Sequence, residues 1–191
     1  MNTLLLIFTF FVSLSSFSAH ETERTFDHSK DVDFLPTSTL NKDQVEILNE
    51  LKDEINSYYG LDNGNPRINS GPCGRFANLF YQKWNERFVD KVSISFIMSA
   101  DSSECYHILL KLPNDKYYDG GNGILKRNKL IKGFEKGTYI IDMIEYDFEL
   151  LDEMSYGLQR EYKLCPNYSD VKTSEIIEKN LMRITEGRIE S

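Results

Sequence analysis

The chain of 191 residues carries 22 Lys and Arg against 30 Asp and Glu, which gives a formal net charge of −8 at neutral pH. This acidic balance argues against a general nucleic-acid-binding protein, because binding to a phosphate backbone relies on clusters of Lys and Arg and none stands out in the sequence. The length is sufficient for one domain with a sizeable hydrophobic core.

The first residues have the features of an export signal. Residues 4–12 are apolar, and a short stretch rich in serine follows and ends in Ala19, which suits cleavage. The apolar run is too short for a comfortable membrane span, and no second run of spanning length occurs in the sequence. An uncleaved anchor is the alternative, since no Lys or Arg precedes the run. We expect residues 1–19 to be a removed signal peptide and the protein to be secreted or periplasmic.

After the signal, the sequence predicts a lead-in and one folded domain. Residues 20–38 are polar, mixed in charge and without periodicity, which is typical of a flexible segment. Residues 39–191 are expected to form a single domain. A helix is predicted over residues 41–59, because Asn41 and Gln44 have the spacing of a capping box and apolar residues follow at helical spacing.

The rest of the chain predicts helices at both ends of a small set of strands. Turn-forming residues at 61–71 precede a helix that begins at Pro72, whose missing N–H costs nothing at the first helical position. Three strands are predicted next, at residues 91–98, 106–112 and 116–119. A short strand at 138–144 and helices at 148–159 and 174–184 complete the chain. This order of elements is typical of an α+β domain.

Cys73 has a sequence context that suits a nucleophile. It lies in the first turn of the helix predicted from Pro72, where free N–H groups and the helix dipole lower the pKa of a thiol. The glycines on either side allow the backbone to approach a substrate closely. The backbone amide of Gly74 and the side chain of Asn69 are candidate donors to an oxyanion.

His107 and Asp119 are the expected partners of Cys73. A hairpin loop of about three to five residues would place His107 and Asp119 directly opposite one another, so that Asp119 holds one imidazole nitrogen while the other faces Cys73. A two-residue turn at residues 114–115 would instead move Asp119 to the opposite face, and the triad would fail.

Each of these residues also has an ordinary structural interpretation. A cysteine at a helix start is often a small buried packing residue, and a histidine on an apolar strand is usually a core or edge residue. An aspartate before two glycines is often a turn former. The three together are more specific than any one of them, because a helix-borne Cys, a strand-borne His and a polar residue one strand later form a catalytic arrangement.

The sequence predicts neither a metal site nor a cofactor. The three histidines are His20, His28 and His107, and the first two lie in the lead-in, so no cluster has the ligand spacing of a zinc site. The glycine-rich residues 120–123 lack the Lys and Ser or Thr that complete a phosphate-binding loop.

The three cysteines, Cys73, Cys105 and Cys165, allow one disulfide in an oxidising compartment. We expect Cys105 to pair with Cys165, because the context of Cys73 suits chemistry. The alternative is that all three are reduced, buried residues.

Two segments resemble the papain-like superfamily of Cys-His-Asp/Asn/His hydrolases and acyltransferases. Residues 71–77 are similar to the helix that carries the nucleophile, and residues 107–119 are similar to the hairpin of the NlpC-type cell-wall peptidases. The third residue of the series is an aspartate, Asp119, which favours the transglutaminase-like branch. Pro72 and Gly74 differ from the Asp and Ser that commonly flank the NlpC-type cysteine, which leaves the substrate open. The similarity covers roughly residues 67–123.

The resemblance implies a papain-like α+β core, in which a helix bearing the nucleophile packs on a small antiparallel sheet. It implies a thiol-dependent hydrolase or acyltransferase acting on an amide bond of a peptide or protein, as a peptidase, amidase, deamidase or transglutaminase-like enzyme, with cell-wall peptide among the substrates it allows. Cys73 would attack, His107 would transfer the proton and Asp119 would orient the imidazole. The alternative is a catalytically silent secreted binding module on the same fold, with a structural or disulfide-bonded Cys73.

Overall fold

The computed structural model describes residues 40–132, 134–143 and 163–186. All of them belong to the second of two compact units, Pro36–Ser191. The predicted signal peptide (1–19), lead-in (20–38) and helix at 148–159 lie outside the described residues. Among the helices that are described, none has the length and apolar character needed to cross a membrane.

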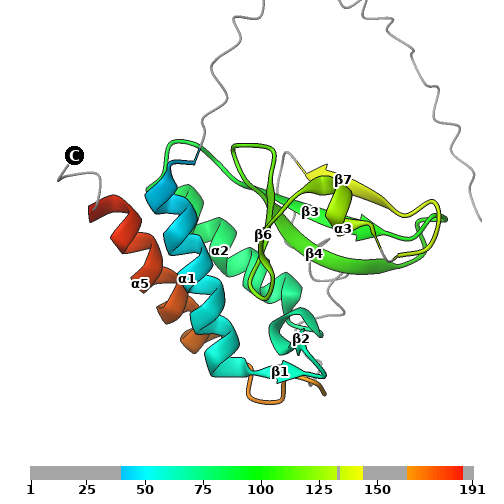
Figure 1. The fold of residues 1–191 in the computed structure, drawn as a ribbon, viewed down its shortest axis with the longest axis horizontal. Coiled ribbons are helices and arrows are strands. Elements are labelled where there is room, and N and C mark those ends of the chain that lie inside the picture. The colour runs from blue at the N-terminus through cyan, green and yellow to red at the C-terminus, as the bar shows by residue number, and fades with distance from the viewer. Residues whose placement is uncertain (1–39, 133, 144–162, 187–191) are drawn as a thin grey trace, which may run out of the picture. The chain divides into compact units, whose positions relative to one another are not determined.

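Helices gather on one side of a sheet (Figure 1). The long helices of the described residues are α1 (Lys42–Tyr59), α2 (Cys73–Arg87) and α5 (Asp170–Glu186). Helix α2 packs against the strands, and α1 and α5 pack against each other, with α5 also against α2. Helix α2 therefore connects the helical layer to the sheet.

The main sheet has five antiparallel strands in the order β6-β5-β4-β3-β7. These are β3 (Ser93–Met98), β4 (Cys105–Lys111), β5 (Tyr117–Asp119), β6 (Gly123–Leu125) and β7 (Tyr139–Met143). A separate two-stranded sheet pairs β1 (Leu61–Asp62) with β2 (Asn65–Pro66). The α+β prediction, with a small antiparallel sheet, is confirmed.

The predicted start of α1 is confirmed in atomic detail. The Gln44 N–H donates to Asn41 Oδ1 at 2.8 Å, and the Asn41 N–H donates to Gln44 Oε1 at 2.9 Å. These are the two bonds of a capping box, which satisfies backbone donors that the first turn of a helix leaves free.

Differences from the sequence prediction are confined to element ends and short elements. Pro72 precedes α2 as its N-cap, so that Cys73 is the first helical residue. Helix α5 begins at Asp170 rather than at residue 174. The sequence analysis missed β1, β2, β6, the 3-10 turn η1 (Arg67–Asn69) and the short helix α3 (Arg127–Leu130). Elements of two to four residues are too short to show a hydrophobic period.

The β4–β5 hairpin closes with a loop of three residues, 113–115. The Leu112 N–H donates to the Lys116 carbonyl at 2.8 Å and so marks the last paired position before the loop. The last loop residue, Asp115, has a φ of 58°, the left-handed conformation that ends a three-residue hairpin loop.

The register of this hairpin corrects one prediction. Leu110 pairs with Tyr118, and continuing that register by one residue brings Asp119 level with Leu109 rather than with His107. The expectation that His107 and Asp119 are directly opposite is wrong by two residues. Because side chains alternate between the two faces with a period of two, a shift of two residues leaves Asp119 on the same face as His107.

Aromatic side chains attach α2 to this hairpin. The rings of Phe80 and Trp84 stack with centroids 5.5 Å apart, and the Tyr118 ring lies 5.2 Å from Phe80 and 6.2 Å from Phe76. All four side chains are buried. Cys73 is the first residue of α2, and Asp119 directly follows Tyr118 on β5. The packing of α2 against Tyr118 therefore sets the distance between Cys73 and Asp119.

We expect Phe80→Ala to lower the free energy of unfolding by about 3–5 kcal/mol, because it leaves a cavity where α2 meets the hairpin. Val89→Ala is the control: Val89 is 92 % exposed, and its truncation should change the free energy by no more than about 0.5 kcal/mol. Denaturant unfolding of the two variants measures both values. Equal effects would mean that the aromatic cluster does not stabilise the fold.

Candidate active site

Cys73 is the first residue of α2, and its side chain is partly buried. Burial by itself raises the pKa of a thiol. Here the hydrogen bond and charge of His107, together with the backbone N–H groups of Ile108 and Gly74, outweigh burial and bring the pKa of Cys73 below its ordinary value. The sulfur therefore lies between the start of α2 and strand β4.

His107, on β4, contacts both of the other residues. Its Nε2 lies 3.1 Å from Asp119 Oδ2, which leaves Nδ1 as the ring nitrogen for Cys73. Burial alone would lower the pKa of an imidazole. The hydrogen bonds to Asp119 and Cys73 and the charges of both outweigh it and raise the pKa of His107 to about 10.

Asp119 is only 2 % exposed, but its carboxylate is fully supplied with donors. Besides His107, Oδ1 accepts from Asn69 Nδ2 at 2.9 Å and from the backbone N–H groups of Gly121 at 2.9 Å and Asn122 at 2.6 Å. Oδ2 also accepts from Asn122 Nδ2 at 3.1 Å. Burial raises the pKa of a carboxyl group, but His107 and these donors outweigh it and lower the pKa of Asp119 to about 2.

These shifts both stabilise the charged forms of the Cys73–His107 pair, a thiolate and an imidazolium. The pKa of Cys73 is lowered mainly by His107, and that of His107 is raised by Asp119 first and by Cys73 second. A thiolate beside an imidazolium is the reactive form of a cysteine nucleophile. The structure thus brings the three predicted residues together: His107 is hydrogen-bonded to Asp119, and Cys73 lies close enough to the imidazole for each to shift the pKa of the other.

Asn69 has a different contact from the one expected. The sequence predicts it as a donor to an oxyanion; in the structure its amide nitrogen donates to Asp119. The backbone amide of Gly74 points at the Cys73 sulfur, next to where a substrate carbonyl would be attacked. Its oxyanion role stays a prediction.

The glycines after Asp119 allow the Asn69 contact. A Cβ on Gly121 would lie 2.3 Å from Pro66 Cβ and 2.6 Å from Asn69 Nδ2, and a Cβ on Gly120 would lie 2.8 Å from the Phe76 ring. Only glycine permits such close approach. Sequence reasoning noted that an aspartate before two glycines is often a turn former, and it missed Asn122. The signal was present, since Asp side chains commonly accept from backbone N–H groups two or three residues later.

The predicted disulfide is absent, because all three cysteines are free thiols. The Cys105 sulfur lies 3.6 Å from the His107 carbonyl on β4. Cys165 is buried, and its carbonyl accepts from the backbone of Tyr168, whose ring stacks on Tyr59 at the end of α1. Burial raises the pKa of Cys105 to about 12, with the charge of Cys73 adding to it, and raises that of Cys165 to about 11.

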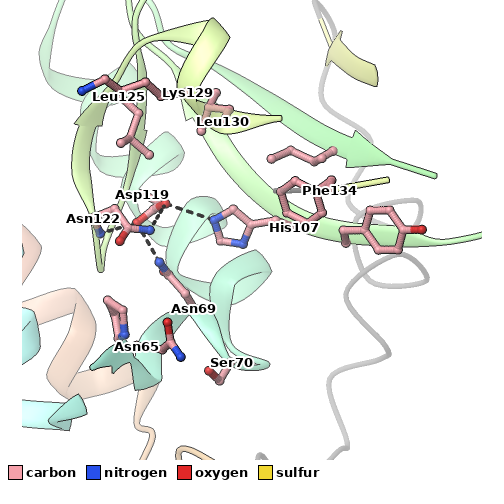
Figure 2. A pocket seen from close by; sticks show the side chains of 13 residues that line it. Asn65, Asn69, Ser70, His107, Asp119, Asn122, Leu125, Lys129, Leu130 and Phe134 are labelled. Carbon is pink, nitrogen blue, oxygen red and sulfur yellow. Dashed lines mark hydrogen bonds and ion pairs between the residues drawn. The ribbon is translucent and has the colours of Figure 1, made fainter. Parts of the chain in front are cut away.

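A cavity of about 450 Å³ borders the site (Figure 2). His107 and Asp119 form part of its lining. The other lining residues are Asn65, Pro66, Asn69, Ser70, Ile97, Tyr106, Asn122, Leu125, Lys129, Leu130 and Phe134. Within the described part of the chain, no three or more His, Cys, Asp and Glu residues gather in a group that could hold a metal ion.

We expect Asn69→Ala to lower the free energy of unfolding by roughly 1.5–3 kcal/mol, because it removes a hydrogen bond to a buried charge. Asn65→Ala is the matched control: Asn65 lines the same cavity but is exposed, and we expect a change within about 0.5 kcal/mol. Chemical denaturation compares the two. An Asn69→Ala protein as stable as Asn65→Ala would show that Asn69 does not support Asp119.

The lowered pKa of Asp119 predicts a pH dependence of stability. Between its ordinary value of 3.8 and the folded value of about 2, the unfolded chain binds the proton more tightly than the folded one. The contribution of Asp119 is therefore complete above pH 3.8 and is lost as the pH falls toward 2. We expect the stability difference between the wild type and Asp119→Asn to shrink over this range, as measured by unfolding at each pH. A constant difference would contradict the assignment.

Comparison with known proteins adds no assignment: no protein-family model, curated protein or solved structure matches the chain. The contacts of Cys73, His107 and Asp119 are therefore the basis for a functional proposal.

Proposed function

We propose that the protein is a secreted thiol-dependent hydrolase or acyltransferase that acts on an amide bond of a peptide or protein. The observation that carries this proposal is the position of His107, which is hydrogen-bonded to Asp119 and lies beside Cys73, with which it shares its pKa shift. The sulfur lies at the start of a helix, where free backbone N–H groups face the reacting centre.

The chemistry follows from this order of contacts. The Cys73 thiolate attacks the amide carbonyl carbon, and the resulting oxyanion lies beside the N–H groups at the start of α2. As the C–N bond breaks, the His107 imidazolium gives its proton to the leaving amine, which leaves a thioester on Cys73. His107 then takes a proton from water, for hydrolysis, or from an amine, for acyl transfer, as that molecule attacks the thioester. Asp119 orients the imidazole and stabilises its charge throughout.

The arrangement also supports a papain-like assignment of the core. The nucleophile opens a helix, the histidine lies on a strand packed against that helix, and the third residue ends the next strand. This is the order that the NlpC-type and transglutaminase-like resemblance implies. The alternative of a silent binding module loses one of its supports, because Cys73 is a free thiol rather than half of a disulfide.

Alkylation with iodoacetamide tests the proposal. Near pH 7 we expect Cys73 to be labelled rapidly, while Cys105 and Cys165, with pKa values of about 12 and 11, stay unlabelled. His107→Ala should slow labelling of Cys73 by about tenfold or more, since each unit of pKa changes the thiolate fraction about tenfold below the pKa. Peptide mass mapping identifies the labelled residue.

A Cys73→Ala variant serves as the control for folding. It should unfold at nearly the same denaturant concentration as the wild type while losing all rapid labelling and all activity on peptide amides. Two results would favour a structural cysteine and the binding-module alternative. In the first, Cys73 reacts only after denaturant is added; in the second, Cys73→Ala unfolds as readily as Phe80→Ala.

A further inference from the structure

The cavity beside the triad has two chemically different sides (Figure 2). Asn65, Asn69 and Ser70 lie on one side of the His107–Asp119 pair, and Leu125, Lys129 and Leu130 lie on the other. The first side offers amide and hydroxyl groups. The second offers aliphatic surface next to the imidazole.

The apolar side is extended by a stacked pair of aromatic rings. Tyr106 and Phe134 lie with their centroids 5.3 Å apart and their planes 10° from parallel. The Tyr106 hydroxyl donates to Glu135 at 2.7 Å, which helps to hold this ring in place. Ile97 and Leu130 are buried, whereas Phe134 is 39 % exposed. The cavity therefore presents a preformed apolar wall, and such a wall favours an apolar ligand group.

The described residues that line the cavity offer a cation no unpaired carboxylate. Asp119 is the acidic residue of the lining, and its carboxylate is already bonded to His107, Asn69 and the backbone after it. Lys129 is exposed and forms no ion pair with another described residue. A cationic group in the cavity would meet Lys129 and His107. Outside the lining, the Glu135 carboxylate already accepts from the Tyr106 hydroxyl at 2.7 Å.

We infer that this cavity favours a substrate with an apolar side chain beside the reacting amide over one with a cationic side chain there. The inference rests on the proposed function, and it adds the substrate class to it. His107 lines the cavity, while Cys73 is not among the described residues that do, so the selected side chain lies on the imidazole side of the sulfur.

The test uses iodoacetamides that differ only in the substituent on the amide nitrogen: unsubstituted, benzyl and trimethylammonioethyl. Alkylation rates of Cys73 are measured for each reagent and divided by the rates for N-acetylcysteine, which removes differences in intrinsic reactivity. We expect the normalised rate for the benzyl reagent to exceed that for the cationic one by at least about tenfold, because the apolar wall packs against the benzyl group and Lys129 repels the cation.

Three variants and one matched control locate the selectivity. Phe134→Ala should reduce the advantage of the benzyl reagent, with Phe134→Leu retaining part of it, and Lys129→Glu should raise the rate for the cationic reagent. Ile141→Ala is the control, because Ile141 is 39 % exposed, as Phe134 is, but does not line the cavity. It should leave all three rates unchanged.

The outcomes separate the inference from the function on which it rests. The inference would be overturned, and the proposed function left standing, by either of two results obtained while the unsubstituted reagent still labels Cys73 rapidly. One is equal normalised rates for all three reagents, and the other is rates that Phe134→Ala and Lys129→Glu do not alter. A Cys73 that resists the unsubstituted reagent as well would overturn both.

Discussion

The aromatic contact between α2 and the β4–β5 hairpin is the constraint on which the site depends. Phe76, Phe80 and Trp84 project from α2 toward Tyr118, and their burial holds the start of the helix against β4. Cys73 is thereby brought to His107 from a segment more than thirty residues away in the sequence. Without this packing no local interaction would join the nucleophile to its base, because neither strand nor helix contains both residues.

A second constraint is the buried carboxylate of Asp119. An isolated charge at 2 % exposure would be costly, and the fold offsets this cost with donors from three sources: the β4 histidine, the 3-10 turn that ends in Asn69, and the backbone that follows Asp119. The close approach of Gly121 to Pro66 and Asn69 makes the arrangement compact. The same donors that stabilise the charge also fix the direction from which it meets His107.

These two constraints give the proposed chemistry its division of roles. The pKa of Cys73 is lowered by His107 and by the backbone N–H groups of Ile108 and Gly74, and that of His107 is raised by Asp119 and Cys73 together. Cys105 lies on the same strand two residues before His107, yet burial raises its pKa to about 12. Position in the fold, rather than the presence of a thiol, therefore separates the candidate nucleophile from the other cysteines.

Local chemistry in the sequence was enough for the α+β class, for the capping box at Asn41 and Gln44 and for naming Cys73, His107 and Asp119 as candidates, because each of these inferences used residues nearby in the chain. That the three candidates lie together depends on tertiary structure. The prediction that Asp119 lies opposite His107 was wrong by two residues. The position at which the loop closes, between Leu112 and Lys116, depends on turn geometry that residue types alone do not specify. The role of Asn69, the absence of the Cys105–Cys165 disulfide and the apolar wall of the cavity were decided only by tertiary structure. Each of these joins residues from separate elements, and their distance in space is set by how the helices pack on the sheet.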